Sequence, residues 1–172
     1  MPASVKEEVL KVAKSRGFTV VRMGDVVREE AMKAGIELKD PDVGNFAHEE
    51  RKRHGFDIWA KRTLPRITSD LSLVDGVRGP TEIEIYRAAF PETLHVVAVH
   101  SSPATRFNRM IRRKRKDDPA NEKEFRDRDE RELKWGQGEV IALADFMIVN
   151  EKDLSSFKAQ VLATIDRILS LR

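Results

Sequence analysis

Two patterns of hydrophobic and polar residues alternate along the chain. Short runs rich in β-branched and apolar residues are typical of buried strands, and they predict strands over 18–23, 71–76, 93–101 and 144–150. Longer stretches with apolar residues three and four positions apart predict amphipathic helices. These predicted helices are one ending at Gly17, then 24–35, 42–55, 56–67, 79–90, 103–115, 121–134 and 153–171.

Strands separated by helices favour βαβ units and a parallel sheet. Right-handed crossovers would cover both faces of that sheet, so the expected fold class is α/β, as a three-layer α/β/α sandwich. Neither a repeat nor a low-complexity linker interrupts the sequence, and residues 1–172 are expected to form a single domain. Ligands of such folds gather at the carboxyl ends of the strands.

Composition narrows the classes of function. The chain has no cysteine, which excludes disulfides and thiolate chemistry and fits a cytoplasmic protein. No apolar run approaches the roughly 20 residues that span a bilayer, so no membrane partner is expected. The net charge is only +3, but the run RRKRK at 112–116 is strongly basic and points to an anionic partner.

The first residues, MPASVKE, resemble the end of a phosphate-binding loop. Such a loop needs glycines that let backbone N–H groups surround phosphates, then a lysine, then Ser or Thr for magnesium. Lys6 is in place, whereas Val5 and Glu7 stand where the last glycine and the Ser or Thr are usual. An ordinary surface lysine in a first helical turn is the alternative for Lys6.

Polar residues follow two of the predicted strands. Asp75 ends one strand, where an acid can hold magnesium or its water, and Arg78 could donate two hydrogen bonds to a phosphate. Asp25 and Arg28 begin the helix after another strand, where anions are favoured. Each has a plain alternative, as a turn or N-terminal aspartate or as a solvated arginine.

The segment 106–135 is too charged to be buried throughout. Its spacing places Arg109, Arg112 and Arg113 on one helix face. Three interpretations remain open: a solvated face, a lid that closes on phosphates, and a nucleic-acid surface over 106–116. Interleaved acids such as Asp117 and Asp127 would repel a phosphate backbone, so nucleic acid is not the expected partner.

Seven short motifs carry a resemblance that spans almost the whole chain. They are MPASVKEE, RMGDVVRE, VDGVRG, VVAVHSSP, RRKRKDDP, RDEREL and GQGEVIALADFMIVN. In order and spacing the chain resembles the P-loop nucleoside monophosphate kinases. It is most similar to the archaeal UPF0200 group of P-loop NTPases, related to adenylate kinase and dephospho-CoA kinase. The resemblance implies that the chain binds ATP and Mg²⁺.

The resemblance also implies roles for single residues. Residues Pro2, Ala3, Ser4, Val5, Lys6 and Glu7 would form the phosphate loop. Arg109 would stack on adenine, and Asn150 would lie near the base. Asp25, Arg28 and Arg78 would bind the phosphate acceptor, within acceptor helices at about 24–67. Arg115 and Arg126 would be catalytic lid arginines in a lid at about 106–135, with Lys6 and the metal-binding Asp75 as the other catalytic residues.

The chain departs from the family pattern at its start. Members of the family carry an apolar strand and a glycine before this Met-Pro, and a glycine at the position of Val5. The first strand is therefore expected to be missing. Its absence would leave two neighbouring strands without their shared partner and expose a sheet edge that favours a homo-oligomer. A start upstream of Met1 and a degraded relative are the two explanations.

The expected function is phosphoryl transfer from ATP to a small nucleotide-like acceptor, as a kinase or NTPase. The alternatives are a catalytically impaired interaction module, which Val5 and Glu7 favour, and a nucleic-acid binder. The sequence does not identify the acceptor, because acceptor choice depends on the shape of a pocket.

Overall fold

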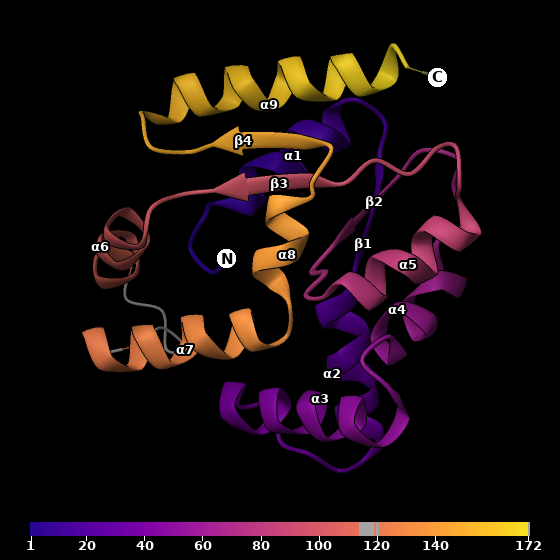
Figure 1. The fold of residues 1–172 in the computed structure, drawn as a ribbon, viewed down its shortest axis with the longest axis vertical. Helices are drawn as coiled ribbons and strands as arrows, with labels where there is room; N and C mark the ends of the chain where they lie inside the picture. The colour runs from indigo at the N-terminus through magenta and orange to yellow at the C-terminus, as the bar shows by residue number, and fades with distance from the viewer. Residues whose placement is uncertain (114–118, 120, 172) are drawn as a thin grey trace. The chain divides into compact units, whose positions relative to one another are not determined.

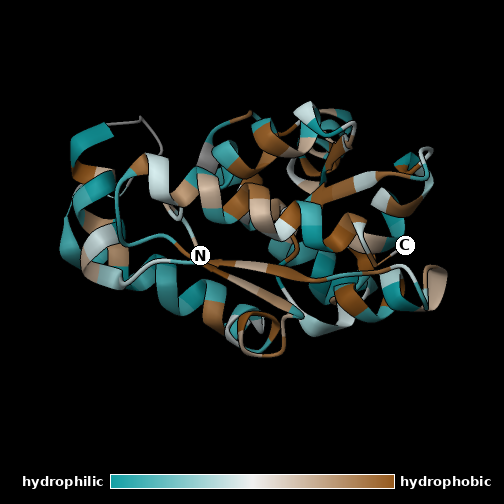
Figure 2. Cartoon of the chain, turned by 90° about the horizontal axis from the view of Figure 1, so that it is seen from above, coloured by the Kyte–Doolittle hydropathy of each residue, from teal (hydrophilic) through white to brown (hydrophobic). Residues whose placement is uncertain are grey.

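A computed structural model describes residues 1–113, 119 and 121–171. The chain divides into two compact units, residues 17–94 and residues 1–16 with 95–172. Figure 1 labels the elements, and Figure 2 shows hydrophobic residues along the strands and mixed surfaces on the helices. Among the described residues, no helix is both long and apolar enough to cross a membrane.

The unit of residues 17–94 holds two strands and a group of helices. Its elements are β1 (Thr19–Arg22), α2 (Met23–Lys33), α3 (Asp40–His54), α4 (Ile58–Thr63), a 3₁₀ turn η1 (Leu64–Arg66), β2 (Ser72–Asp75) and α5 (Pro80–Ala89). β1 and β2 pair in parallel, with Thr19 opposite Ser72 and Arg22 opposite Asp75. The expected interruption at Pro65 is confirmed, because the chain passes there from α4 into the 3₁₀ turn.

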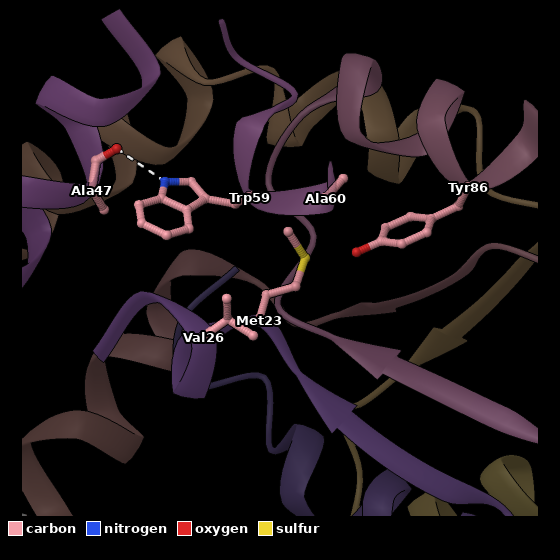
Figure 3. Packing of buried hydrophobic residues seen from close by; sticks show 6 residues of the cluster. All are labelled: Met23, Val26, Ala47, Trp59, Ala60 and Tyr86. Atoms are coloured by element: carbon pink, nitrogen blue, oxygen red, sulfur yellow. Dashed lines mark hydrogen bonds between the residues drawn. The ribbon is translucent and has the colours of Figure 1, made fainter. Parts of the chain in front are cut away.

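A hydrophobic cluster forms the core of this unit. It consists of Met23, Val26, Ala47, Trp59, Ala60 and Tyr86. Figure 3 shows the Trp59 indole inside the cluster, where its Nε1 donates a 3.1 Å hydrogen bond to the carbonyl oxygen of Ala47. The helices α2, α3, α4 and α5 all contribute to this cluster, so it is what joins them.

The second unit combines the start of the chain with its C-terminal half. Its elements are α1 (Lys6–Ser15), β3 (Val97–His100), α6 (Pro103–Arg113), α7 (Glu122–Lys134), α8 (Gln137–Ala142), β4 (Phe146–Val149) and α9 (Leu154–Leu169). β3 and β4 pair in parallel, with Val97 opposite Phe146 and His100 opposite Val149. Helices α1 and α9 lie side by side, and α9 also packs against β4 (Figure 1).

The predicted α/β class, with parallel strands and intervening helices, is confirmed. Among the described residues the strands form two sheets of two strands each, β1–β2 and β3–β4. The sequence did not predict this pairing, because sequence patterns identify strands but not their partners. Helix α8 was not predicted. It follows Gly136, which has a φ of 92°, and contains Gly138, and glycines normally weaken the prediction of a helix.

Candidate functional site

Residues 1–5 form a strained loop that leads into α1. Ala3 and Val5 have φ angles of 60° and 67°, and they are the only described residues other than glycine with a positive φ. This conformation is costly for a β-branched side chain, at about 1–3 kcal/mol per residue, and it persists only where the surroundings hold it. Turns of this kind can direct successive N–H groups to one side, and such concave turns bind anions.

Helix α1 begins directly after this loop. Lys6 is its first residue and is half-buried, and the exposed Glu7 follows it. The first N–H groups of a helix lack partners within the helix and favour a negative charge. The loop, the start of α1 and Lys6 are the elements for which the sequence predicts a phosphate site, and that role stays a prediction.

Asn150 connects this loop to the end of β4. Its Nδ2 donates a 3.1 Å hydrogen bond to the carbonyl oxygen of Ser4, 146 residues away in sequence. The Ser4 hydroxyl in turn donates to the carbonyl oxygen of Met1 at 2.9 Å. Ser4 and Asn150 are 1% and 3% exposed, and the hydrogen bond between them is buried.

Arg109 of α6 contacts the same asparagine. Its guanidinium donates to the Ser101 hydroxyl at 2.9 Å and to both the main-chain oxygen and Oδ1 of Asn150 at 3.1 Å each. Ser101 also donates to the main-chain oxygen of Asn150, at 2.8 Å. The expected stacking of Arg109 on adenine and the expected place of Asn150 near the base stay predictions. What the structure shows is that both side chains are hydrogen-bonded within the protein.

Glu151 fastens the beginning of α6 to the end of β4. Its carboxylate accepts a 2.6 Å hydrogen bond from the Thr105 hydroxyl and another from the main-chain N–H of Ser102. These two hydrogen bonds, with that of Thr105 first, lower the pKa of Glu151 below its ordinary value of 4.5.

The two expected lid arginines have different outcomes. Arg115 lies outside the described residues. Arg126 is exposed on α7 and donates a 2.6 Å hydrogen bond to Glu122, one turn earlier. A different arginine links α6 to α7: Arg106, only 3% exposed, donates two hydrogen bonds to the Asp129 carboxylate.

The structure also bears on the basic surface considered for nucleic acid. Arg106 is buried against Asp129, with its guanidinium 5.0 Å from the Phe125 ring centre, and Arg109 is bonded to Ser101 and Asn150. Arg112 and Arg113 are exposed, and 114–116 lie outside the described residues. Of the described arginines in 106–116, two therefore face inward and two remain accessible.

The expected acceptor residues lie in the unit 17–94. Asp25 and Arg28 are exposed at the start of α2, where they form an ion pair. Asp75 ends β2 opposite Arg22, the last residue of β1, and the adjoining Gly76 has a φ of 107°. A Cβ at Gly76 would lie 3.4 Å from Cβ of Met23, so the turn after Asp75 adjoins the start of α2.

Arg78 follows in the turn before α5. Its main-chain N–H donates a 2.6 Å hydrogen bond to the Glu82 carboxylate, which also accepts from Gly79 and pairs with the buried Arg51. The structure thus gathers the expected acceptor residues Asp25 and Arg28, and Asp75 beside them, at one edge of the β1–β2 sheet. The residues of the phosphate loop belong to the other unit.

The described residues contain no group of three or more His, Asp or Glu side chains that could hold a metal ion. Mg²⁺ in nucleotide enzymes is commonly bound by one or two carboxylates together with substrate phosphates and water. A carboxylate such as Asp75 is compatible with a magnesium ion that arrives with a nucleotide.

Sequence reasoning missed Ser101, Asp129 and Glu151. Ser101 was signalled, because the motif VVAVHSSP places two serines directly after a strand, where ligands of α/β proteins gather. Asp129 carried no such signal, since it lies in a run of alternating charges and its partner Arg106 is 23 residues away.

Comparison with known proteins gives matches along most of the chain. Residues 1–126 match the family model of an AAA domain. A UPF0200 protein of Thermoplasma acidophilum is 48% identical over 161 residues, which cover 93% of this chain and 88% of the relative. UPF0200 proteins of Hyperthermus butylicus and Pyrococcus abyssi are 44% and 43% identical, over 98% of this chain and 91% and 94% of the relatives.

Proposed function

The chain belongs to the archaeal UPF0200 family of nucleotide-binding P-loop proteins, and on this premise we propose that it binds magnesium–ATP at residues 2–7. We propose further that it transfers a phosphoryl group to a small nucleotide-like acceptor. The observation that carries the proposal is the left-handed backbone of Ala3 and Val5 directly before Lys6. A fold keeps such strain where function requires it, and a phosphate-binding loop requires this backbone.

Bound ATP would supply the phosphoryl group and its magnesium ion. The protein's part is alignment and neutralisation of charge, because phosphoryl transfer needs little covalent chemistry from side chains. Lys6 would neutralise the donor phosphates, and Asp75 would hold magnesium or its water. Asp25, Arg28 and Arg78 would orient the acceptor, and Arg115 and Arg126 would offset charge on the transferred group.

Isothermal titration with magnesium–ATP tests the binding step. Lys6→Ala should weaken the affinity about 10- to 100-fold, because a charge-assisted hydrogen bond to phosphate is lost. The matched control is Lys14→Ala, an exposed lysine at the other end of the same helix, which should leave the affinity unchanged. Equal binding by the wild type and Lys6→Ala would contradict the proposal.

A second candidate is a protein that binds nucleotide without turnover. Glu7 favours it, because a carboxylate stands where a Ser or Thr hydroxyl usually binds magnesium, and it adds negative charge beside a triphosphate. Release of ADP from saturating magnesium–ATP, with candidate acceptors present, separates the two. Binding with no ADP release with any acceptor tested would favour the second candidate.

A further inference from the structure

We propose that Asn150 is a positioning residue that holds the phosphate loop in its binding conformation, and that it does not contact the base of a nucleotide. The inference rests on the proposed function, because it gives the loop its ligand. It differs from the expectation drawn from the sequence, in which Asn150 lies near the base.

The orientation of the Asn150 amide follows from its neighbours. A guanidinium can only donate hydrogen bonds, so the side-chain atom facing Arg109 must be the oxygen, Oδ1, at 3.1 Å. The Nδ2 group then faces the carbonyl oxygen of Ser4, which can only accept. Arg109 therefore sets the orientation of Asn150, and Asn150 binds the loop.

The main-chain oxygen of Asn150 reinforces this arrangement. It accepts from both Arg109 and Ser101, so the end of β4 is fixed by α6 and by the residue that follows β3. Ser4, Ser101 and Asn150 are at most 3% exposed. Water cannot readily replace a hydrogen bond lost here, and the Ser4 carbonyl would be left without this donor.

The hydrogen bond to Ser4 acts between the two strained residues of the loop. Ala3 and Val5, on either side of Ser4, both have left-handed backbone. Such strain persists only when surrounding contacts determine the conformation. The Asn150 side chain binds the main chain of the loop at the Ser4 carbonyl oxygen. This hydrogen bond therefore keeps the N–H groups of the loop in place.

Asn150→Asp is the sharpest variant. It preserves size and can still accept from Arg109, but it turns an acceptor toward the Ser4 carbonyl oxygen. Titration with magnesium–ATP and with magnesium–tripolyphosphate, which has no base, should show both affinities reduced by a similar factor of about tenfold. A loss for ATP with unchanged binding of tripolyphosphate would overturn the proposal, because it would show that Asn150 recognises the base.

Two further variants guard against a trivial loss of folding. Gln160→Ala removes another side-chain amide bond to this strand, that of Gln160 Nε2 to the Val149 carbonyl oxygen at 3.2 Å, without touching the loop. It should leave both affinities unchanged. Ser101→Ala removes one hydrogen bond of Arg109 and should reduce both affinities in parallel, by less than Asn150→Asp. A Ser101→Ala protein that binds ATP and tripolyphosphate as the wild type does would contradict the proposal that Arg109 orients Asn150.

Backbone NMR order parameters of Ser4 to Lys6, measured without nucleotide, separate this proposal from the proposed function. They should be near 0.85 in the wild type and approach about 0.6 in Asn150→Asp. If the wild type binds neither ATP nor tripolyphosphate, the proposed function fails, while a fall in these order parameters still supports positioning. Unchanged order parameters in Asn150→Asp would overturn positioning in either case.

Discussion

The Trp59 cluster of residues 17–94 and the hydrogen-bond network of Ser4, Ser101 and Asn150 are both buried, yet they differ in what is buried. The Trp59 cluster consists mainly of apolar side chains, and its helices have ordinary backbone. The network instead buries hydrogen-bonding groups, in Ser4, Ser101 and Asn150. The loop of residues 1–5 that it holds has strained backbone. The Trp59 cluster holds a fold together, whereas the loop network holds one conformation that the chain would not otherwise favour.

The unit of residues 17–94 also buries polar groups, and its described residues do so without strained backbone of this kind. The carboxylate of Glu82 is fully buried but accepts from Arg51 and from two main-chain N–H groups, so its burial is compensated. Burial strongly raises the pKa of the Tyr86 hydroxyl, and an interaction with the Thr63 side chain offsets part of this rise.

The largest effect should come from emptying the Trp59 cluster. Trp59→Ala removes a side chain that is 0% exposed and should lower the free energy of unfolding by about 3–5 kcal/mol. Urea unfolding followed by circular dichroism measures this. Trp135→Ala is the control, because Trp135 is only half-buried at the end of α7, and an equal loss in both variants would remove the distinction.

A smaller effect, of opposite sign, should come from relieving the loop. Val5→Gly removes a β-branched side chain from a left-handed position and should stabilise the protein by about 1 kcal/mol, after the greater freedom of glycine in the unfolded chain is counted. The same change at Val12, in the helical backbone of α1, should be destabilising. Destabilisation by Val5→Gly in urea unfolding would show that the loop is not strained.

The smallest effect should be a pH dependence at Glu151. Its pKa is lower in the folded chain than the ordinary 4.5, so its contacts stabilise the fold above that pH and are lost as the pH falls through the folded value. Glu151→Gln should therefore be less stable than the wild type near neutral pH and equal to it once the pH lies below the folded pKa of Glu151. Glu84→Gln, at an exposed carboxylate on α5, controls for net charge; a difference for Glu151→Gln that persists in acid would contradict this origin.

Local sequence patterns located most of the elements but few of the contacts. The four strands of the described residues lie within their predicted ranges, because short apolar runs between turn residues are strong local signals. Asn150 was expected at the end of a strand for the same reason. Its partner Ser4 could not be predicted, because no local pattern pairs residues that are 146 positions apart.

The charged segment shows the limit most clearly. Helical spacing places Arg109, Arg112 and Arg113 on one face, and it does not distinguish Arg106 from the other charges of the segment. Its burial depends on Asp129, on another helix, and on the Phe125 ring beneath it. Side chains that meet across helices decide which charge of a run is buried, and composition alone does not contain that information.

The two hydrogen bonds between Arg106 and Asp129 also have a mechanical consequence. The buried guanidinium of Arg106 cannot leave the Asp129 carboxylate without being left unpaired away from water. Sliding of α6 along α7 would break this contact, whereas rotation of both helices together preserves it. If this part of the chain closes over a ligand, α6 and α7 should move together as one rigid body, with the bending confined to the segments that flank the pair.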